Sequence, residues 1–542
     1  MSTRLKTEGS GSALSTDGYT SPLGDTAYYS IGGYRLNAEA EQKRDGWKAR
    51  SDSEPWRIAD PIDWDANRPE DPNWYAQLHG WRPMDPHLQA YRRTGDGAHL
   101  RYIIPWAVSW PEYRERAPQQ RWKALNALAG MRATRLGLVL DAYRRGDVEL
   151  TGREQATLLV LAREFAANLM AQGGIQSMNH GYYQIMGLEL LSRVLPEERW
   201  AKDALIRVAQ AFEGLVSAQF TDEGVHVENS PVYHWYAVDQ MTRSGALERL
   251  ASPRIEDLVT KARASVPWLT FPDGGVADIG DSAGPGRPFV DAGENTVDLG
   301  KGKYCVAPFW RSGYGIVRSL PDVPPPEASM LLLVGTSHSH THSHADKLSF
   351  ELYEFGRRLI VDTGKYGYRR DPMRSYIESA IAHNTVGLED HPIKRTEVML
   401  GGTSLFEPVV QDDAVVLSGK IEWDTKQYAF THRREMTYRP GESLIVADSL
   451  SSVDPRWYVS RLHFDRSLDV RQDAPSRLRA DLGDGRVMEV TTNGGEITLH
   501  RGETDPVKGW QSVGYLEAEP ATMAEVWGQG RESVIVWRIT FT

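Results

Sequence analysis

The first half of the chain, from about residue 41 to 265, carries apolar residues at the three- and four-residue spacing of amphipathic helices. The spacing is clearest in RWKALNALAGMRATRLGLVLDAYRRG (121–146) and in REQATLLVLAREFAANLMAQGG (153–174), which stops at two helix-ending glycines. Similar runs cover 181–196, 198–220 and 235–251. Helices joined by short loops pack antiparallel, so this half predicts helical hairpins stacked into a toroid or a solenoid.

The pattern changes at FPDGGVADIGDSAGPGRPF (271–289), whose Gly, Pro and Asp content predicts a loop or linker. Beyond it, short runs alternate as strands do, and in KLSFELYEF the residues Leu348, Phe350 and Leu352 share one parity. The turn in TTNGGEI (491–497) predicts a hairpin. Further β-rich runs lie at 356–364, 443–450, 488–500 and 532–542. Many short strands over such a length predict an antiparallel β-sandwich.

These changes in pattern divide the chain into four parts. Residues 1–40 predict a flexible polar tail, and residues 41–270 a helical domain. Residues 271–303 predict a linker, and residues 304–542 the β-sandwich domain.

Composition narrows the classes of partner. The net charge of −11 argues against a nucleic-acid partner, because phosphate contact needs a basic surface, although an acidic ligand can bind in a local basic cleft. The single cysteine, Cys305, excludes an internal disulfide and a cysteine-based zinc site. No apolar run is long enough for a bilayer, so no membrane partner is expected. The N-terminal residues lack the apolar segment of a secretory signal. We expect a cytoplasmic protein, or a periplasmic or secreted one if a leader precedes this sequence.

The candidate chemistry begins with TSHSHTHSHADK (336–347), which places histidines at every second position from 338 to 344. A tract of this kind is either a loop of solvated histidines or a metal or catalytic site. In an extended segment His342 and His344 point the same way. A turn at 354–356 would return Asp362 toward His344, and His383 begins another apolar run. Two histidines and a carboxylate suit zinc; alternatively, Asp362 caps a turn and His383 is a hydrogen-bonded core residue.

Two segments of the helical half carry further polar groups. SMNHGYYQ places Asn179 and His180 just before an apolar run, and HVENSPVYHWY places Tyr233 and His234 after a Ser-Pro helix start. Taken singly, Asn179-His180 is typical of a helix cap, and Tyr233-His234 is typical of a helix start with an aromatic anchor.

Taken together, these motifs resemble those of the heparinase II/III-like polysaccharide lyases, which include oligoalginate lyases. The matching segments, in order, are Asn179-His180, ENSPVYH, HSHADKLSFEL, LIVDTGKYGY and HNTV. The resemblance implies an N-terminal (α/α) toroid of helical hairpins followed by a C-terminal antiparallel β-sandwich. His338 and His340 have no counterpart in the family pattern.

The resemblance also implies β-elimination on a uronic-acid-containing polysaccharide, glycosaminoglycan-like or alginate-like, leaving an unsaturated uronate end. Asn179 with His180 would hold the substrate carboxylate. Tyr233 would be the acid, and also the base where proton and leaving group share a face, and His342 a second base or charge stabiliser. The metal ligands would be His344, Asp362 and His383, holding one divalent ion, zinc, in a structural role.

Candidate substrate-binding residues complete the prediction. They are Tyr182, Glu228, His234, Lys365, Arg369 and Arg374, the last three in a loop that also holds Arg370. Basic side chains there suit an acidic sugar chain, although a solvated charged loop has the same composition. The expected partner is an acidic polysaccharide or oligosaccharide, bound by a monomer or homodimer. Two other functions stay open: a zinc-dependent hydrolase, and a non-catalytic protein that binds acidic carbohydrate.

Overall fold

The fold is described from a computed structural model. It covers residues 14–23, 38–49, 53–66, 72–116, 128–176, 179–243, 245–291, 293–300, 302–391, 393–400, 404–424, 428–483 and 485–542. The chain forms two compact units, one of Met1–Ala218 with Asp239–Glu256 and one of Gln219–Val238 with Asp257–Thr542. The predicted boundaries at residues 270 and 303 do not coincide with this division, and each unit is described by itself below.

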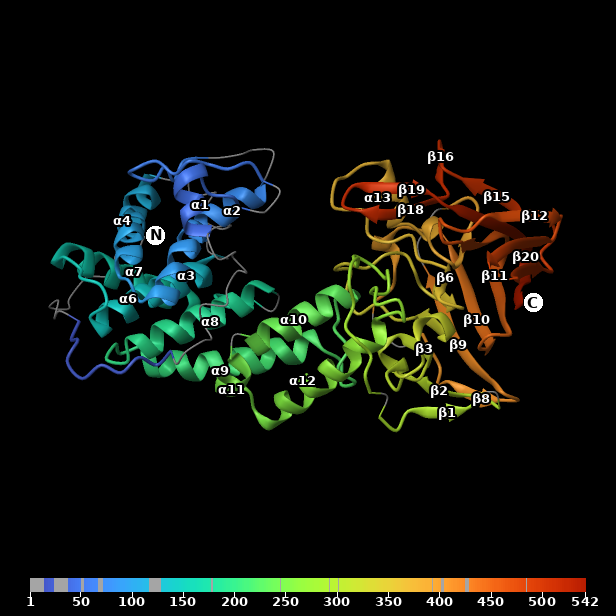
Figure 1. Ribbon diagram of the computed structural model, residues 1–542, viewed down its shortest axis with the longest axis horizontal. Coiled ribbons are helices and arrows are strands. Elements are labelled where there is room, and N and C mark those ends of the chain that lie inside the picture. The colour runs from blue at the N-terminus through green and yellow to red at the C-terminus, as the bar shows by residue number, and fades with distance from the viewer. Residues whose placement is uncertain are drawn as a thin grey trace. The chain divides into compact units, whose positions relative to one another are not determined.

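The first unit is helical (Figure 1). Its helices are α1 (Ala38–Asp45), α2 (Pro72–His79), α3 (Asp85–Thr94), α4 (Ala98–Arg116), α6 (Ala129–Arg145), α7 (Gly152–Met170), α8 (Asn179–Val194), α9 (Ala201–Gln219) and α11 (Ala246–Leu250). The helical runs predicted up to residue 220 are confirmed, apart from residues 121–127, which lie outside the described residues. The run predicted over 235–251 is divided between two helices, α10 (Pro231–Arg243) and α11. Helix α7 begins where Thr151 and Glu154 form a reciprocal capping box. Helices α6 and α8 approach so closely that a Cβ at Gly130 would lie 2.4 Å from the backbone of Gln184.

Part of the predicted tail is packed against this unit. Leu14 and Leu23 are buried, and the hydroxyls of Tyr19 and Ser21 each donate to Asp141 at 2.7 Å. These contacts correct the prediction of a free polar tail for residues 14–23. A buried carboxylate needs hydrogen-bond donors, and this segment supplies them. The rest of the predicted tail before Ala38 lies outside the described residues.

The second unit contains the first part of α10 (Pro231–Arg243), the last part of α12 (Pro253–Ser265) and the antiparallel sheets that follow. The first sheet has the order β1-β2-β3-β4-β5-β6, where the strands are β1 (Thr296–Asp298), β2 (Lys303–Val306), β3 (Tyr314–Ser319), β4 (Met330–Val334), β5 (Phe350–Glu354) and β6 (Arg357–Ile360). All pairings in it are antiparallel.

The second sheet has the order β12-β13-β14-β20-β11-β10-β9-β8, with β7 and β15 attached to β11 and β20. Its strands are β7 (Val386–Leu388), β8 (Val409–Gln411), β9 (Ala414–Asp424), β10 (Ala429–Arg439), β11 (Ser443–His463), β12 (Val470–Ala474), β13 (Arg477–Gly483), β14 (Arg486–Thr492), β15 (Thr498–Arg501) and β20 (Thr522–Phe541). One core joins inward side chains of both sheets, among them Leu333, Phe350, Leu417 and Val446. The predicted β-sandwich is therefore confirmed.

Strand β5 differs from its prediction, because every residue of it is buried and not only one parity. One face packs into the core between the sheets, and Tyr353 on the other packs with Phe271 and Ile279. The segment predicted as a linker thus forms a third layer, because its scattered apolar residues cover the outer face of the first sheet.

Two turns were predicted in this unit, and one of them forms. The turn at Phe355 and Gly356 joins β5 to β6, which pair antiparallel. The hairpin predicted at TTNGGEI does not form, since β14 and β15 both pair with β20. The long strand β20 offers a backbone edge to each of them, and that pairing replaces the local one.

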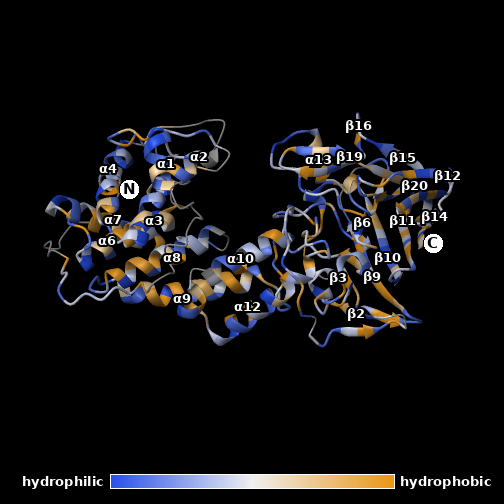
Figure 2. Ribbon diagram, in the orientation of Figure 1, coloured by the Kyte–Doolittle hydropathy of each residue, from blue (hydrophilic) through white to orange (hydrophobic). Residues whose placement is uncertain are grey.

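Hydrophobic and hydrophilic residues are mixed along the helices (Figure 2). Among the described residues, no helix has the length and apolar content needed to cross a membrane.

Arg434 on β10 should be a main contributor to the stability of the second unit. It is fully buried, pairs with Asp448 at 2.7 Å and 2.8 Å, and donates to the backbone carbonyls of Leu348 and Asn384. Replacing it with Met leaves Asp448 with only part of its partners, so we expect the unit to lose about 3–5 kcal/mol of stability. Thermal and denaturant unfolding measure the loss. The neighbouring Arg433 is exposed on the opposite face, and Arg433→Met should change stability by less than about 0.5 kcal/mol.

Candidate active site

Two aromatic side chains meet at the centre of the candidate site. Tyr233 lies in the first turn of α10, which begins at Pro231 as predicted, and its backbone N–H donates to the Ser230 hydroxyl. Its ring stacks on the imidazole of His342, with centroids 3.6 Å apart and planes 10° from parallel. Both belong to the second unit, so this pair is defined within one compact body.

The histidine row is a folded loop and not the extended segment that was predicted. His342 has a φ of 55°, in the left-handed region, so alternation along a strand does not apply. Asn229, also at φ 55°, holds the loop: its amide donates to the carbonyls of Ser339 at 2.8 Å and Thr341 at 3.2 Å. Two non-glycine residues in this conformation at one place indicate a geometry enforced by the surroundings.

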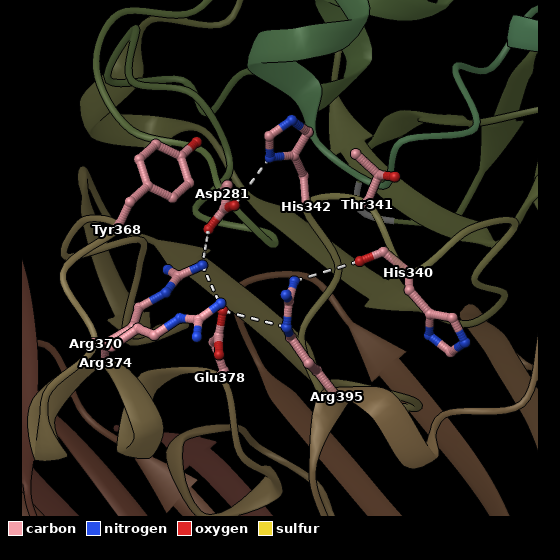
Figure 3. Close-up of a pocket in the computed structure, with 9 residues that line it drawn as sticks. All are labelled: Asp281, His340, Thr341, His342, Tyr368, Arg370, Arg374, Glu378 and Arg395. Atoms are coloured by element: carbon pink, nitrogen blue, oxygen red, sulfur yellow. Dashed lines mark hydrogen bonds and ion pairs between the residues drawn. The ribbon is translucent and has the colours of Figure 1, made fainter. Parts of the chain in front are cut away.

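Asp281 contacts the imidazole of the stacked pair and is 2% exposed. Its carboxylate bonds Nδ1 of His342 at 2.9 Å, Nε2 of His344 at 3.3 Å and Nη2 of Arg374 at 2.8 Å. Figure 3 shows it between the ring of His342 and the guanidinium of Arg374. Burial alone would raise the pKa of Asp281, but the bonds from the two histidines and the charge of Arg374 hold it well below the usual range.

The phenols of Tyr233 and Tyr368 are hydrogen-bonded to each other at 2.9 Å. Burial raises the pKa of Tyr233; the hydrogen bond with Tyr368 opposes this, and the negative charges of Asp281 and Glu228 add to it. Tyr233 is therefore protonated at neutral pH. The ammonium of Lys365 lies 4.7 Å from the ring centroid of Tyr368 and 6.0 Å from that of Tyr233. That cation favours any negative charge that develops on either phenol.

Glu228 faces the other side of the imidazole. Its Oε2 lies 3.6 Å from Nε2 of His342, and the side chain is 1% exposed. Neither of its oxygens has a hydrogen-bond partner among the described residues. Burial raises its pKa, opposed by His342. The carboxyl is therefore placed to interact with the ring nitrogen of His342, while its oxygen atoms are closed off from solvent, and its predicted role in binding substrate stays a prediction.

A pocket of about 510 Å³ opens beside these residues (Figure 3). It is lined by Asp281, His340, Thr341, His342, Tyr368, Arg370, Arg374, Glu378 and Arg395. Glu378 pairs with Arg374 at 2.7 Å and with Arg395 at 3.3 Å. Among the described residues Arg370 has no ion pair, so its charge is available to a ligand. Three guanidinium groups and two carboxylates line this hollow, so the lining carries an excess of positive charge that suits an anionic ligand despite the net charge of −11.

A second cluster of polar side chains contacts Asp281 through His344. Ligand atoms of His344, Asp362 and His383 all lie within 4.8 Å of one another, and all three residues are buried. Asp362 accepts from Nδ1 of His383 at 2.7 Å. Nδ1 of His344 is buried and has no hydrogen-bond partner among the described residues. The β5–β6 turn brings Asp362 back as predicted. The donor set matches what a divalent cation such as zinc requires.

Several predicted site residues have other surroundings. The hydroxyl of Tyr182 donates to the carbonyl of Gln240, and the His234 ring bonds the carbonyl of Ala262 at 3.0 Å. Both side chains are buried, and burial lowers the pKa of His234 to about 4. Their placement is that of packing residues, since the polar group of each side chain is engaged inside the protein, and their predicted role in binding substrate stays a prediction.

The three arginines of the basic loop have different surroundings. Arg369 is exposed and held by Asp371 at 2.8 Å, outside the pocket lining. Arg374 is buried against Asp281 and donates to the carbonyl of Lys365. Arg370 lines the pocket. Their order in the sequence gives no sign of this division, because it depends on how the loop turns around α13 (Pro372–Ile377).

The two unmatched histidines also have separate roles. Nε2 of His338 lies 3.1 Å from the carbonyl of Ser312, so it anchors the loop. His340 is exposed and lines the pocket, and its carbonyl accepts from Arg395. Asn179 and His180 open α8 in the helical unit, where His180 is exposed.

Sequence reasoning missed Asp281, Tyr368, Glu378 and Arg395. Tyr368 lies six residues after Asp362 in the quoted LIVDTGKYGY motif, which was a usable signal. Asp281 sits among the glycines of 271–289, where an aspartate also suits a turn.

Known proteins provide an independent comparison. Residues 44–255 match the family described as Heparinase II/III N-terminus, and residues 302–534 match Heparinase II/III-like, C-terminal. No curated protein matches the chain significantly.

Solved structures have the same fold at low identity. A heparinase III with methylated lysines is 14% identical, with 96% of this chain and 86% of that chain covered and a TM-score of 0.70. Another heparinase III structure is 16% identical, with 98% and 87% covered and a TM-score of 0.68. A mutant of the heparan sulfate lyase HepC from Pedobacter heparinus is 15% identical, with 95% and 84% covered and a TM-score of 0.66.

Proposed function

Because this chain belongs to the heparinase II/III-like family, we propose that it is a polysaccharide lyase. It cleaves a uronic-acid-containing polysaccharide, glycosaminoglycan-like, by β-elimination and leaves an unsaturated uronate end. The observation that carries the proposal is the stacked pair of Tyr233 and His342 beside a pocket lined by arginines. The pair supplies acid–base groups, and the arginines suit an acidic sugar chain.

Elimination needs a proton taken from C5 of the uronate and a proton given to the departing oxygen on C4. As the C5 proton leaves, the C4–C5 double bond forms and the C4–O bond breaks. Tyr233 is the donor to that oxygen, because its raised pKa keeps it protonated. His342, whose Nδ1 is held by Asp281, is the base, or stabilises charge where Tyr233 takes both roles.

The negative charge that develops next to the uronate carboxylate has to be stabilised. From the family resemblance, Asn179 and His180 on α8 are proposed to bind that carboxylate. Arg370 and Arg395 are proposed to bind acidic groups of the chain that enter the pocket.

His344, Asp362 and His383 are proposed to hold one divalent ion, zinc. Their convergence within 4.8 Å and the unpartnered Nδ1 of His344 support this. Such an ion would brace the loop before β5 against β6 and the segment before β7.

The test is the ultraviolet absorbance of unsaturated uronates, measured with heparan sulfate, chondroitin, hyaluronan, alginate and glucuronan. We expect absorbance to grow with at least one of them. Hydrolysis products and bound sugar have no such chromophore. New reducing ends without absorbance would replace the proposal with a hydrolase, and binding without either would replace it with a carbohydrate-binding protein.

Arg370→Ala should weaken substrate binding with little change in kcat. Its free guanidinium lines the pocket, and one charge-assisted hydrogen bond of about 1.5 kcal/mol corresponds to roughly a tenfold rise in KM. Steady-state kinetics at low and moderate salt measures it, and the effect should shrink as salt rises. Arg369→Ala is the matched control, because its guanidinium already pairs with Asp371. Equal effects of the two changes would contradict a specific role for Arg370.

A further inference from the structure

Asp281 connects two groups of residues that the proposed function treats as separate. Oδ2 bonds Nδ1 of His342, and Oδ1 bonds Nε2 of His344. One carboxylate therefore contacts the ring of the proposed base and the ring of a proposed metal ligand. Arg374 donates to the same Oδ1 at 2.8 Å.

The hydrogen-bonding capacity of a carboxylate determines which nitrogen of each imidazole carries the proton. It has only acceptor atoms, so each imidazole must present an N–H to it. His342 then carries its proton on Nδ1 and leaves Nε2 as the basic atom. His344 carries its proton on Nε2 and leaves Nδ1 free, and that nitrogen has no other partner among the described residues. The freed nitrogen of each ring is the one that its proposed task needs.

We propose that Asp281 is a positioning residue that sets the tautomer and orientation of both His342 and His344. The proposal rests on the proposed function for His342 and on the proposed metal site for His344. It makes metal binding and catalysis depend on one side chain.

The backbone around Asp281 leaves the carboxylate little freedom. Gly280 has a φ of 54°, and a Cβ there would lie 2.3 Å from the carbonyl oxygen of His342. The next backbone N–H, that of Asp281, donates to the same carbonyl at 3.0 Å. The Ser230 hydroxyl donates to the Asp281 carbonyl at 3.3 Å. Asp281 is thus tied to the His342 loop and to the start of α10, which carries Tyr233.

A matched comparison exists in the same unit. Asp448 is fully buried and accepts from Nε2 of His432 and from Arg434, both at 2.7 Å. Like Asp281 it is held by histidine and arginine, with the Ser460 hydroxyl in place of a second histidine, but it lies in the sheet core. Asp448→Asn therefore reproduces the structural cost of losing a buried carboxylate without touching the candidate site.

The experiment compares Asp281→Asn with Asp448→Asn in the full-length protein. An asparagine replaces one carboxylate oxygen by an NH2 group, which donates, so it cannot accept at both of the positions that the two rings contact. For Asp281→Asn we expect kcat to fall by about 10–100-fold and zinc affinity to fall by about 10–100-fold. KM should change less than kcat, because the carboxylate, which is 2% exposed at the edge of the pocket, is already engaged by His342, His344 and Arg374. Asp448→Asn should lower the melting temperature while kcat and zinc affinity stay near wild type.

The outcomes separate this proposal from the proposed function. If the wild-type protein forms no unsaturated product with any polymer, the lyase proposal fails, and zinc affinity of the Asp281 variant decides its role at His344. Unchanged kcat and zinc affinity in a folded Asp281→Asn variant overturn the inference. If that variant does not fold, Asp281→Glu serves instead. It keeps the charge for Arg374 and displaces the acceptor, so both quantities should still fall, and wild-type values for both would overturn the inference.

Discussion

Tyr233→Phe should lower kcat by about 10²–10⁴-fold, the contribution of one acid–base group. The change removes the proton that the departing oxygen needs and keeps the ring that stacks on His342. The phenol bonds only Tyr368 among the described side chains, so folding and KM should stay close to wild type. Formation of unsaturated product, with a melting curve for each variant, measures the effect.

Tyr304→Phe is the control for loss of a hydroxyl in the same unit, since Tyr304 lies on β2 away from the pocket. It should keep wild-type kcat. A Tyr233→Phe variant that turns over at nearly the wild-type rate would remove this residue from the mechanism, and Tyr368 would become the candidate acid.

His383→Ala should abolish stoichiometric zinc and destabilise the second unit. His383 is fully buried, and the other two residues of the cluster are His344, in the loop before β5, and Asp362, just after β6. Loss of about 2 kcal/mol in a unit of about 300 residues lowers the melting temperature by roughly 3 °C, since the entropy of unfolding is about 2.1 cal/mol/K per residue. Elemental analysis and thermal unfolding give the two readings. Chelation of the wild-type protein should reproduce both, and activity should fall with the metal, because His342 lies two residues from a ligand.

His432→Ala is the control for a lost buried imidazole. His432 is 1% exposed and bonds Asp448 at 2.7 Å, outside the metal cluster. It should lower stability and leave the zinc content unchanged. Wild-type protein that purifies without metal and has full activity would leave His344, Asp362 and His383 as hydrogen-bonded core residues.

The amino-acid sequence by itself determined the order of the architecture. The helical period of 153–174 and the alternation of strand runs such as 443–450 depend only on neighbouring residues. The short turn at 354–356 could also be predicted from neighbouring residues, and a turn there brings Asp362 close to His344. The motif around Tyr233 was visible for the same reason: a proline after a serine marks where a helix begins.

Only the tertiary structure decided which polar groups meet. Asp281 lies 61 residues from His342 and 93 from Arg374, and no periodicity relates positions so far apart. The folded loop of His342 depends on Asn229, which comes from the segment before α10. Likewise His234 and Tyr182 look polar and available in sequence but are buried by helices packed over them. A local pattern shows which face of a helix or strand is apolar. Which groups become hydrogen-bond partners in the interior depends on how segments distant in the sequence pack together.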